Sequence, residues 1–177
     1  FNDETVGAEA KKLHTDALAL LDEVVKGKML QAKGVVGIWP ANAVGDDIEV
    51  YKADMSGAKL GTFHTLRQQE EREDTTYYAM SDFVAPKDSG VQDYVGAFVV
   101  SAGFGCHELC EKYRKENDDY KGIMMEAIAD RLAEAFAELL HAKMRKELWG
   151  YAADEALSTE DLLKVKYQGI RPAPGYP

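Results

Sequence analysis

The sequence predicts an α+β fold, with a mainly antiparallel, twisted sheet flanked by helices and one long helix near the C-terminal end. Segments with strand patterns cluster in the middle of the chain, and helical periodicity occupies both ends. The strands do not alternate with helices along the chain, which argues against a parallel sheet built from βαβ units. We expect residues 1–177 to form a single domain.

The first helix is predicted by apolar residues that recur at steps of three and four from Val6 to Val24. Asn2 or Asp3 is a suitable cap for its start, and Gly27 is a suitable stop. Residues 34–40 and 47–53 then change to strand patterns, separated by the turn-like sequence "ANAVGD". This arrangement predicts a hairpin or a pair of near-neighbour strands, with the adjacent Asp46 and Asp47 as turn formers.

Two further strands are expected, around Tyr77–Val84 and over Tyr94–Ala102. The segment "KLGTFHTL" fits either a strand or the approach to a short helix. Helical patterns follow Gly105. A long helix is expected to begin at Asp118 or Asp119 and to end near residues 149–150, with an apolar stripe of Met124, Ile128, Leu132, Ala135 and Leu139.

A last short helix is expected to begin at Ser158, whose hydroxyl can cap it while Asp161 stands at the third helical position. This helix should end before Gly169. Three of the five prolines of the chain lie in the six residues that follow Arg171.

Composition and charge limit the classes of function. The chain is 46% hydrophobic and 29% charged, as expected of a globular protein, and it has no apolar run long enough to span a membrane. A net charge of −10 argues against nucleic acid as a partner. Two cysteines form no disulfide framework, so we expect a reducing, cytoplasmic location. Because the chain begins with Phe1, we expect an excised or processed piece.

No metal or covalent site is predicted. Cys106 and Cys110 stand four apart around His107, but a structural zinc site needs four ligands and no second cluster exists. We therefore interpret both cysteines as structural or incidental. His14 and His141 lie beside charged residues on helices and are expected to face solvent. No glycine-rich nucleotide loop or nucleophile elbow is present.

Two places remain as candidates for ligand binding. Glu134 has alanines on both sides, so a ligand can approach its carboxylate, although the pattern alone favours a solvated helix face. The terminal segment "YQGIRPAPGYP" cannot be helical, because each proline fixes its own φ and pushes the preceding residue to an extended conformation. It presents the Arg171 guanidinium on a stiff backbone, and such a planar fork suits a carboxylate. A terminal arm that only packs across the domain fits the pattern equally well.

The terminal segment resembles the R-x-x-x-G-Y signature of the reactivation domain of cobalamin-dependent methionine synthases. "GVVGIWPANAVGDDIEVY", "LRQQEE", "DFVAPKDSG", "DYVGAFVV" and "ADRLAEAFAELLH…RKELWGYA" resemble the same domain in the same order. The resemblance covers nearly the whole chain. It implies that residues 1–177 are an incomplete activation domain of such an enzyme, since the family domain continues beyond the Gly-Tyr-Pro.

The resemblance implies an S-adenosylmethionine site. By this resemblance, Arg171 binds the methionyl carboxylate of the ligand, the backbone near Ala173 and Gly175 contacts its nucleoside and amino-acid parts, Tyr176 lines the site, and Glu134 is a further ligand-side residue. In the family an acidic residue precedes the Tyr-Gln-Gly, where this chain has Val165 and Lys166.

The resemblance also implies the role of the domain. It supports the reductive methylation of cob(II)alamin to methylcobalamin, in which S-adenosylmethionine donates the methyl group and a flavodoxin-type donor supplies the electron. Cobalamin is bound mainly by another domain of the same parent chain. The chain is thus part of a methyltransferase of methionine biosynthesis, and the isolated fragment is not expected to be active alone. The alternative is a stand-alone, non-enzymatic module that reactivates or docks a separate corrinoid protein.

Overall fold

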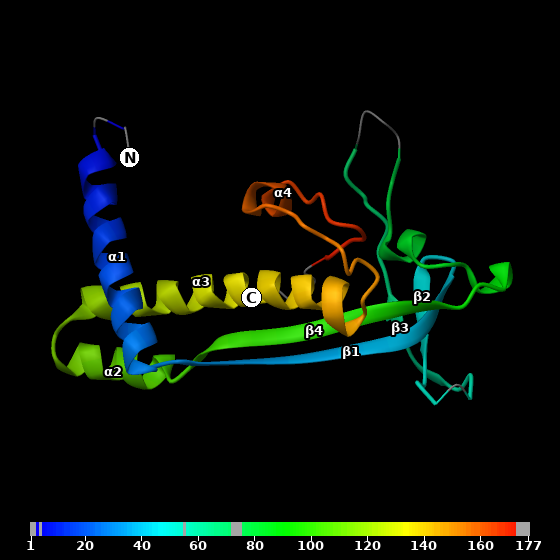
Figure 1. The fold of residues 1–177 in the computed structure, drawn as a ribbon, viewed down its shortest axis with the longest axis horizontal. Helices are drawn as coiled ribbons and strands as arrows, with labels where there is room; N and C mark the ends of the chain where they lie inside the picture. The colour runs from blue at the N-terminus through cyan, green and yellow to red at the C-terminus, as the bar shows by residue number, and fades with distance from the viewer. Residues whose placement is uncertain (1–2, 4, 55, 72–75, 173–177) are drawn as a thin grey trace. The chain divides into compact units, whose positions relative to one another are not determined.

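The structure, a computed structural model, describes residues 3, 5–54, 56–71 and 76–172. Figure 1 shows its helices and strands. In chain order they are α1 (Gly7–Gly27), β1 (Gln31–Val44), β2 (Asp47–Tyr51), β3 (Lys59–His64), the 3-10 turns η1 (Met80–Phe83) and η2 (Lys87–Ser89), β4 (Asp93–Phe104), α2 (Cys106–Lys115), α3 (Asp119–Lys143), the π-helical turn η3 (Met144–Leu148) and α4 (Thr159–Leu163).

The four strands form one antiparallel sheet in the order β3-β2-β1-β4, so the predicted α+β class is confirmed. The predicted hairpin is present, with Ala43 opposite Ile48 and Val44 opposite Asp47. Its first strand is longer than expected. The residues "ANAV" belong to β1 because Ala41 and Ala43 are buried and paired with β2, which leaves only two residues in the turn.

The strand expected around Tyr77–Val84 is wrong. Its second half is the 3-10 turn η1, in which the backbone N–H of Val84 donates to the carbonyl of Ser81. The Asp82 carboxylate accepts a hydrogen bond from the backbone N–H of Ala79 at 2.9 Å and so closes the turn. This local bond competes with strand pairing, which explains the departure from the apolar pattern. The ambiguous "KLGTFHTL" segment, in contrast, forms β3.

The chain divides into two compact units, and each is described by itself. Unit 1 comprises Phe1–Val35 and Phe98–Lys143, and unit 2 comprises Val36–Ala97 and Met144–Pro177. The core of unit 1 lies where α1, α2 and the first half of α3 meet (Figure 1). Its buried residues are Leu20, Val24, Cys110, Tyr113, Met124, Met125 and Ile128.

The apolar stripe predicted for α3 is correct only in its first half. Met124 and Ile128 are buried, whereas Leu139 is 54% exposed and Leu140 is buried instead. A Cβ on Gly34 of β1 would lie 3.1 Å from the Leu140 side chain, so this part of α3 packs against the strand. Because the packing partner changes along the helix, the buried face changes too.

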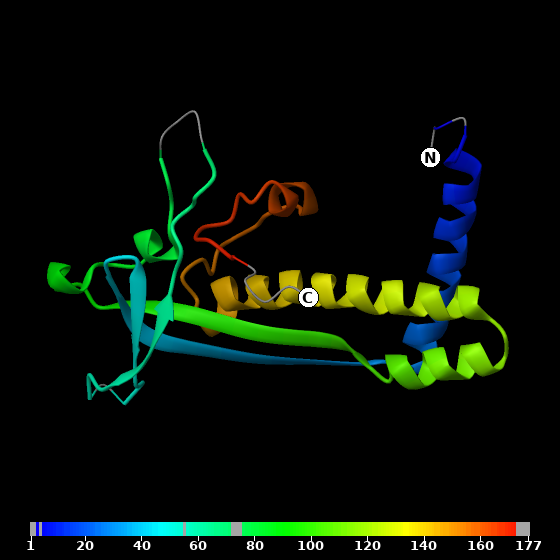
Figure 2. The same ribbon diagram turned by 180° about the vertical axis from the view of Figure 1, so that it is seen from behind.

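The core of unit 2 is centred on Ala41, Ile48 and Val50, with Trp39 and Val95 packed against it. Figure 2, seen from behind, shows β2 and β3 side by side in this unit. Two close approaches depend on glycine. A Cβ on Gly37 would lie 2.1 Å from the Trp39 ring, and one on Gly96 would lie 2.9 Å from the Trp149 ring. The two indoles therefore cover β1 and β4 directly.

Arg67 ties the segment after β3 to the hairpin turn and to η1. Its guanidinium donates to both carboxylate oxygens of Asp82 at 2.7 and 2.9 Å, to Asp46 at 2.6 Å and to the carbonyl of Tyr77 at 2.6 Å. Hydrogen bonds from Arg67 and from the backbone N–H of Ala79 lower the pKa of Asp82 to about 2. The ionised form of Asp82 is therefore the form that this network stabilises.

We expect this network to be lost at low pH. Because the pKa of Asp82 is lower in the folded protein than its ordinary value of 3.8, its contribution to stability is present above about pH 4 and disappears as pH falls toward 2. The Asp82→Asn variant should have a lower urea midpoint than the wild type at pH 7, and the difference should shrink between pH 4 and pH 2. An Asp88→Asn control should track the wild type. A difference independent of pH would contradict this account.

The short helix α4 forms as predicted. Ser158 accepts a hydrogen bond from the backbone N–H of Asp161 at 3.2 Å, and the Asp161 side chain reaches back to the N–H of Ser158. At the other end, the N–H of Val165 donates to the carbonyl of Leu162, and that of Lys166 donates to the carbonyl of Asp161. This Schellman pattern places Val165 in the left-handed region, at φ +55°, where glycine is usual.

Val165→Gly should therefore stabilise the protein. A β-branched residue in the left-handed region costs about 1–2 kcal/mol, and Val165 is 61% exposed, so little burial is lost. We expect the free energy of unfolding to rise by about 1 kcal/mol, measured by urea denaturation. Val165→Ala keeps a Cβ and should gain clearly less. Equal gains for alanine and glycine would show that the left-handed backbone carries no such cost.

Candidate functional site

Arg171 follows α4 by eight residues and lies immediately before Pro172, outside any helix or strand. The side chain is partly buried, and Pro172 is exposed. The predicted site residues Ala173, Gly175 and Tyr176 lie outside the described residues. Of the four site residues predicted in the terminal segment, only Arg171 is therefore among the residues that the structure describes.

Three successive residues determine the path of the backbone that leads to Arg171. The Tyr167 ring is buried, the carbonyl of Gln168 accepts a hydrogen bond from the Tyr151 hydroxyl at 3.2 Å, and Gly169 adopts φ +89°. A Cβ on Gly169 would lie 3.2 Å from that hydroxyl, so glycine suits this position in both backbone conformation and space.

A hollow of about 380 Å³ lies in the same part of unit 2. It is lined by residues 151–155, Leu157 and residues 166–168. Aromatic rings and carboxylates line it together, through Tyr151, Tyr167, Asp154 and Glu155.

Sequence reasoning missed the residue on which this region is built. Arg145 in η3 is completely buried, and its guanidinium donates two hydrogen bonds to Glu155, from Nε at 2.7 Å and from Nη2 at 2.6 Å. The same guanidinium lies 4.6 Å from the centre of the Tyr167 ring. In the sequence Arg145 stands between Met144 and Lys146 in a charged helix end, and nothing in that pattern separates it from a solvated arginine.

Glu134 lies on α3 in unit 1, partly buried, and forms an ion pair with Arg131 one turn away, at 2.6 Å. A second polar residue of this helix departs from expectation. His141 is 6% exposed and stacks on Phe98, with ring centres 6.3 Å apart, so the expectation that it faces solvent is wrong.

The two cysteines support the packing of α2 on α3. Their Sγ atoms are 3.8 Å apart, and the Cys110 Sγ lies 3.5 Å from the carbonyl oxygen of Gly122. Burial, with the neighbouring Cys110 thiol, raises the pKa of Cys106 to about 12, so the thiol stays protonated at neutral pH. Among the residues that the structure describes, no group of three or more metal-ligating side chains occurs.

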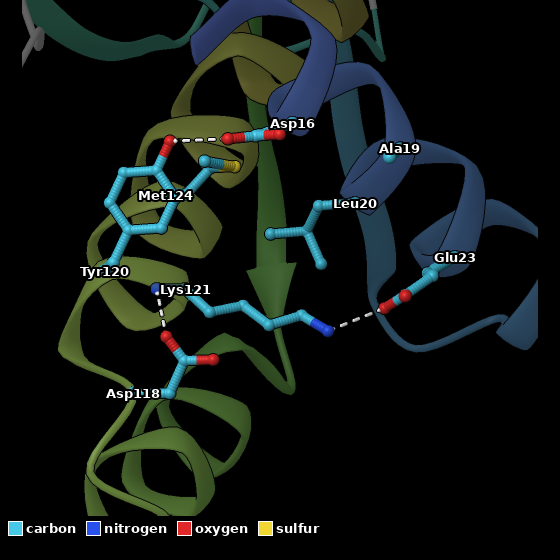
Figure 3. A pocket seen from close by; sticks show the side chains of 8 residues that line it. All are labelled: Asp16, Ala19, Leu20, Glu23, Asp118, Tyr120, Lys121 and Met124. Carbon is cyan, nitrogen blue, oxygen red and sulfur yellow. Dashed lines mark hydrogen bonds and ion pairs between the residues drawn. The ribbon is translucent and has the colours of Figure 1, made fainter. Parts of the chain in front are cut away.

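A smaller hollow of about 220 Å³ separates α1 from the start of α3 in unit 1 (Figure 3). Its polar groups bind one another. Tyr120 donates to Asp16 at 3.0 Å, and Lys121 donates to Glu23 at 2.9 Å. These contacts fasten α1 to α3. Within the described ranges, no helix is long and apolar enough to cross a membrane.

Residues 1–177 match the family model described as "Vitamin B12 dependent methionine synthase, activation domain". The chain therefore belongs to the family of methionine synthase activation domains, as the sequence resemblance indicated.

A crystal structure of the MetH reactivation domain bound to AdoHcy (S-adenosylhomocysteine) is similar to this chain, with 51% sequence identity and a TM-score of 0.89. The match covers 99% of this chain and 54% of the other, so the chain spans about half the length of the structure that it matches.

Proposed function

We propose that this chain binds S-adenosylmethionine and presents its methyl group for the reductive methylation of cob(II)alamin in a methionine synthase. The observation that carries the proposal is the position of Arg171, immediately before Pro172 on a segment that packs against the rest of unit 2. The similarity of the chain to a solved structure with AdoHcy bound supports the same proposal. AdoHcy is the product that remains when S-adenosylmethionine loses its methyl group.

The described residues fit such a ligand. A guanidinium can bind the methionyl carboxylate through two parallel charge-assisted hydrogen bonds. The backbone before Arg171 is already held by burial of Tyr167 and by the hydrogen bond from Tyr151 to the carbonyl of Gln168, so little conformational freedom is lost on binding. Ala173, Gly175 and Tyr176 are proposed to complete the contacts to the ligand, and Glu134 to act as a further ligand-side residue.

In this role the protein needs only to bind S-adenosylmethionine and to orient its methyl group. A reduced cobalamin, bound by another domain, supplies the nucleophile that accepts the methyl group. The task of Arg171 and its neighbours is to fix the amino-acid end of the ligand, so that the sulfonium methyl is held in one direction. We further propose a flavodoxin-type electron donor as partner and a cytoplasmic location, in keeping with two free cysteines.

Arg171→Ala should lower the affinity for AdoHcy by about 10- to 150-fold, because a charge-assisted contact of about 1.5–3 kcal/mol is removed. The affinity is measured by calorimetry on the full-length protein, with AdoHcy as a probe that transfers no methyl group. Arg171→Lys keeps the charge without the planar fork, so its affinity should lie between those of the wild type and Arg171→Ala. Arg114→Ala, an exposed arginine of α2, is the matched control. Unchanged affinity in Arg171→Ala would overturn the proposal.

Glu134→Gln should lower the AdoHcy affinity by about 2- to 10-fold, because one charged acceptor becomes neutral. The same titration measures it. Glu138→Gln, one turn further along α3, serves as the control and should bind as the wild type does. Wild-type affinity in Glu134→Gln would contradict a role for Glu134 at the ligand.

A further inference from the structure

The end of the long helix is not regular. At Met144 the α-helix gives way to the π-helical turn η3, and the backbone N–H groups of Trp149 and Gly150 both donate to the carbonyl of Met144, at 2.9 and 3.2 Å. π-turns are rare and occur frequently at functional sites. In this turn the side chain of Arg145 is completely buried.

Arg145 connects three segments of unit 2. Its guanidinium binds Glu155 with two hydrogen bonds and lies against the Tyr167 ring, and its carbonyl accepts the N–H of Ala152 at 2.9 Å. The Glu155 side chain is only 9% exposed. A buried ion pair adds little net stability, because removing both charges from water is costly, but its two parallel bonds permit only one arrangement. The main effect of the pair is therefore to fix how the segments that carry Arg145 and Glu155 lie against each other.

Tyr151 adds a second connection to the same segment. Its ring meets Trp149 edge-on, with centres 5.3 Å apart, and its hydroxyl donates to the carbonyl of Gln168 at 3.2 Å. Arg145 thus fixes residue 167 and Tyr151 fixes residue 168. Arg171 follows Gly169 by two residues, so its Cα is at most about 7 Å from that of Gly169.

From these contacts we infer that Arg145 and Tyr151 are positioning residues for Arg171. They touch no ligand themselves. They hold residues 167–169 so that the guanidinium of Arg171 is presented in the direction in which it binds the ligand carboxylate. This inference rests on the proposed function of Arg171.

The sharpest test is Tyr151→Phe, because it removes one hydroxyl and leaves the ring against Trp149. AdoHcy affinity of the full-length protein should fall by about 3- to 10-fold, the effect of one lost hydrogen bond on the position of Arg171, while the urea midpoint changes little. Tyr120→Phe is the matched control, since it removes the hydroxyl bound to Asp16 in unit 1. That control should leave the affinity unchanged.

Arg145→Lys tests the buried pair. Lysine keeps the charge near Glu155 but forms no parallel fork, so the affinity should fall while circular dichroism shows a folded protein. Amide hydrogen exchange gives a readout that needs no ligand. In both the Arg145→Lys and the Tyr151→Phe variants, the amides of Ile170 and Arg171 should exchange faster than in the wild type.

A double-mutant cycle separates positioning from other roles. If Tyr151 acts through Arg171, Tyr151→Phe should have no further effect on affinity in an Arg171→Ala background. Additive losses would overturn the inference, because they would mean direct ligand contact or general destabilisation. Unchanged affinity in Tyr151→Phe and Arg145→Lys, with Arg171→Ala still impaired, would overturn it while leaving the proposed function intact. Unchanged affinity in Arg171→Ala would overturn both.

Discussion

The C-terminal part of unit 2 depends on the buried pair of Arg145 and Glu155. Residues 149–172, which follow η3, contain one five-residue helix, and Tyr167 is the one residue of this stretch that is buried. The guanidinium of Arg145, in the turn η3, supplies the contacts that hold this segment in one conformation. It binds a carboxylate at residue 155 and an aromatic ring at residue 167, so residues 156–166, which include α4, are fixed at both ends.

The π-helical turn η3 carries both Arg145 and the carbonyl that binds the N–H groups of Trp149 and Gly150. The wider turn changes the direction of the following side chains, and the indole of Trp149 then covers Gly96 of β4. Helix end, sheet and terminal segment in unit 2 are therefore joined by neighbouring residues of a single turn. Such a frame suits a binding site whose task is orientation.

Sequence patterns predicted correctly those elements that depend on interactions between residues close together in the sequence. The hairpin, α1, the cap of α4 at Ser158 and the α+β class follow from periodicity, turn chemistry and hydrogen bonds between near neighbours in the sequence. The errors arose where distant contacts decide. The Asp82 carboxylate closes the 3-10 turn locally, through the N–H of Ala79, but Arg67 holds that carboxylate from 15 residues away. In α3, packing against β1 selects which face of the helix is buried. Arg145 was missed for the same reason, since its partners lie 10 and 22 residues away.

The strained backbone at Val165 belongs to the same arrangement. The left-handed residue ends α4 abruptly, which brings Lys166 back to the Asp161 carboxylate at 2.6 Å and sends the next side chain, Tyr167, into the interior. A regular helical continuation would not make that reversal. The cost of the left-handed valine is thus offset by burial of the Tyr167 ring against Arg145, and strain of this kind persists only where the surroundings over-determine the conformation. The segment that carries Arg171 is consequently held in place from both sides, by the end of α4 before it and by the buried arginine beneath it.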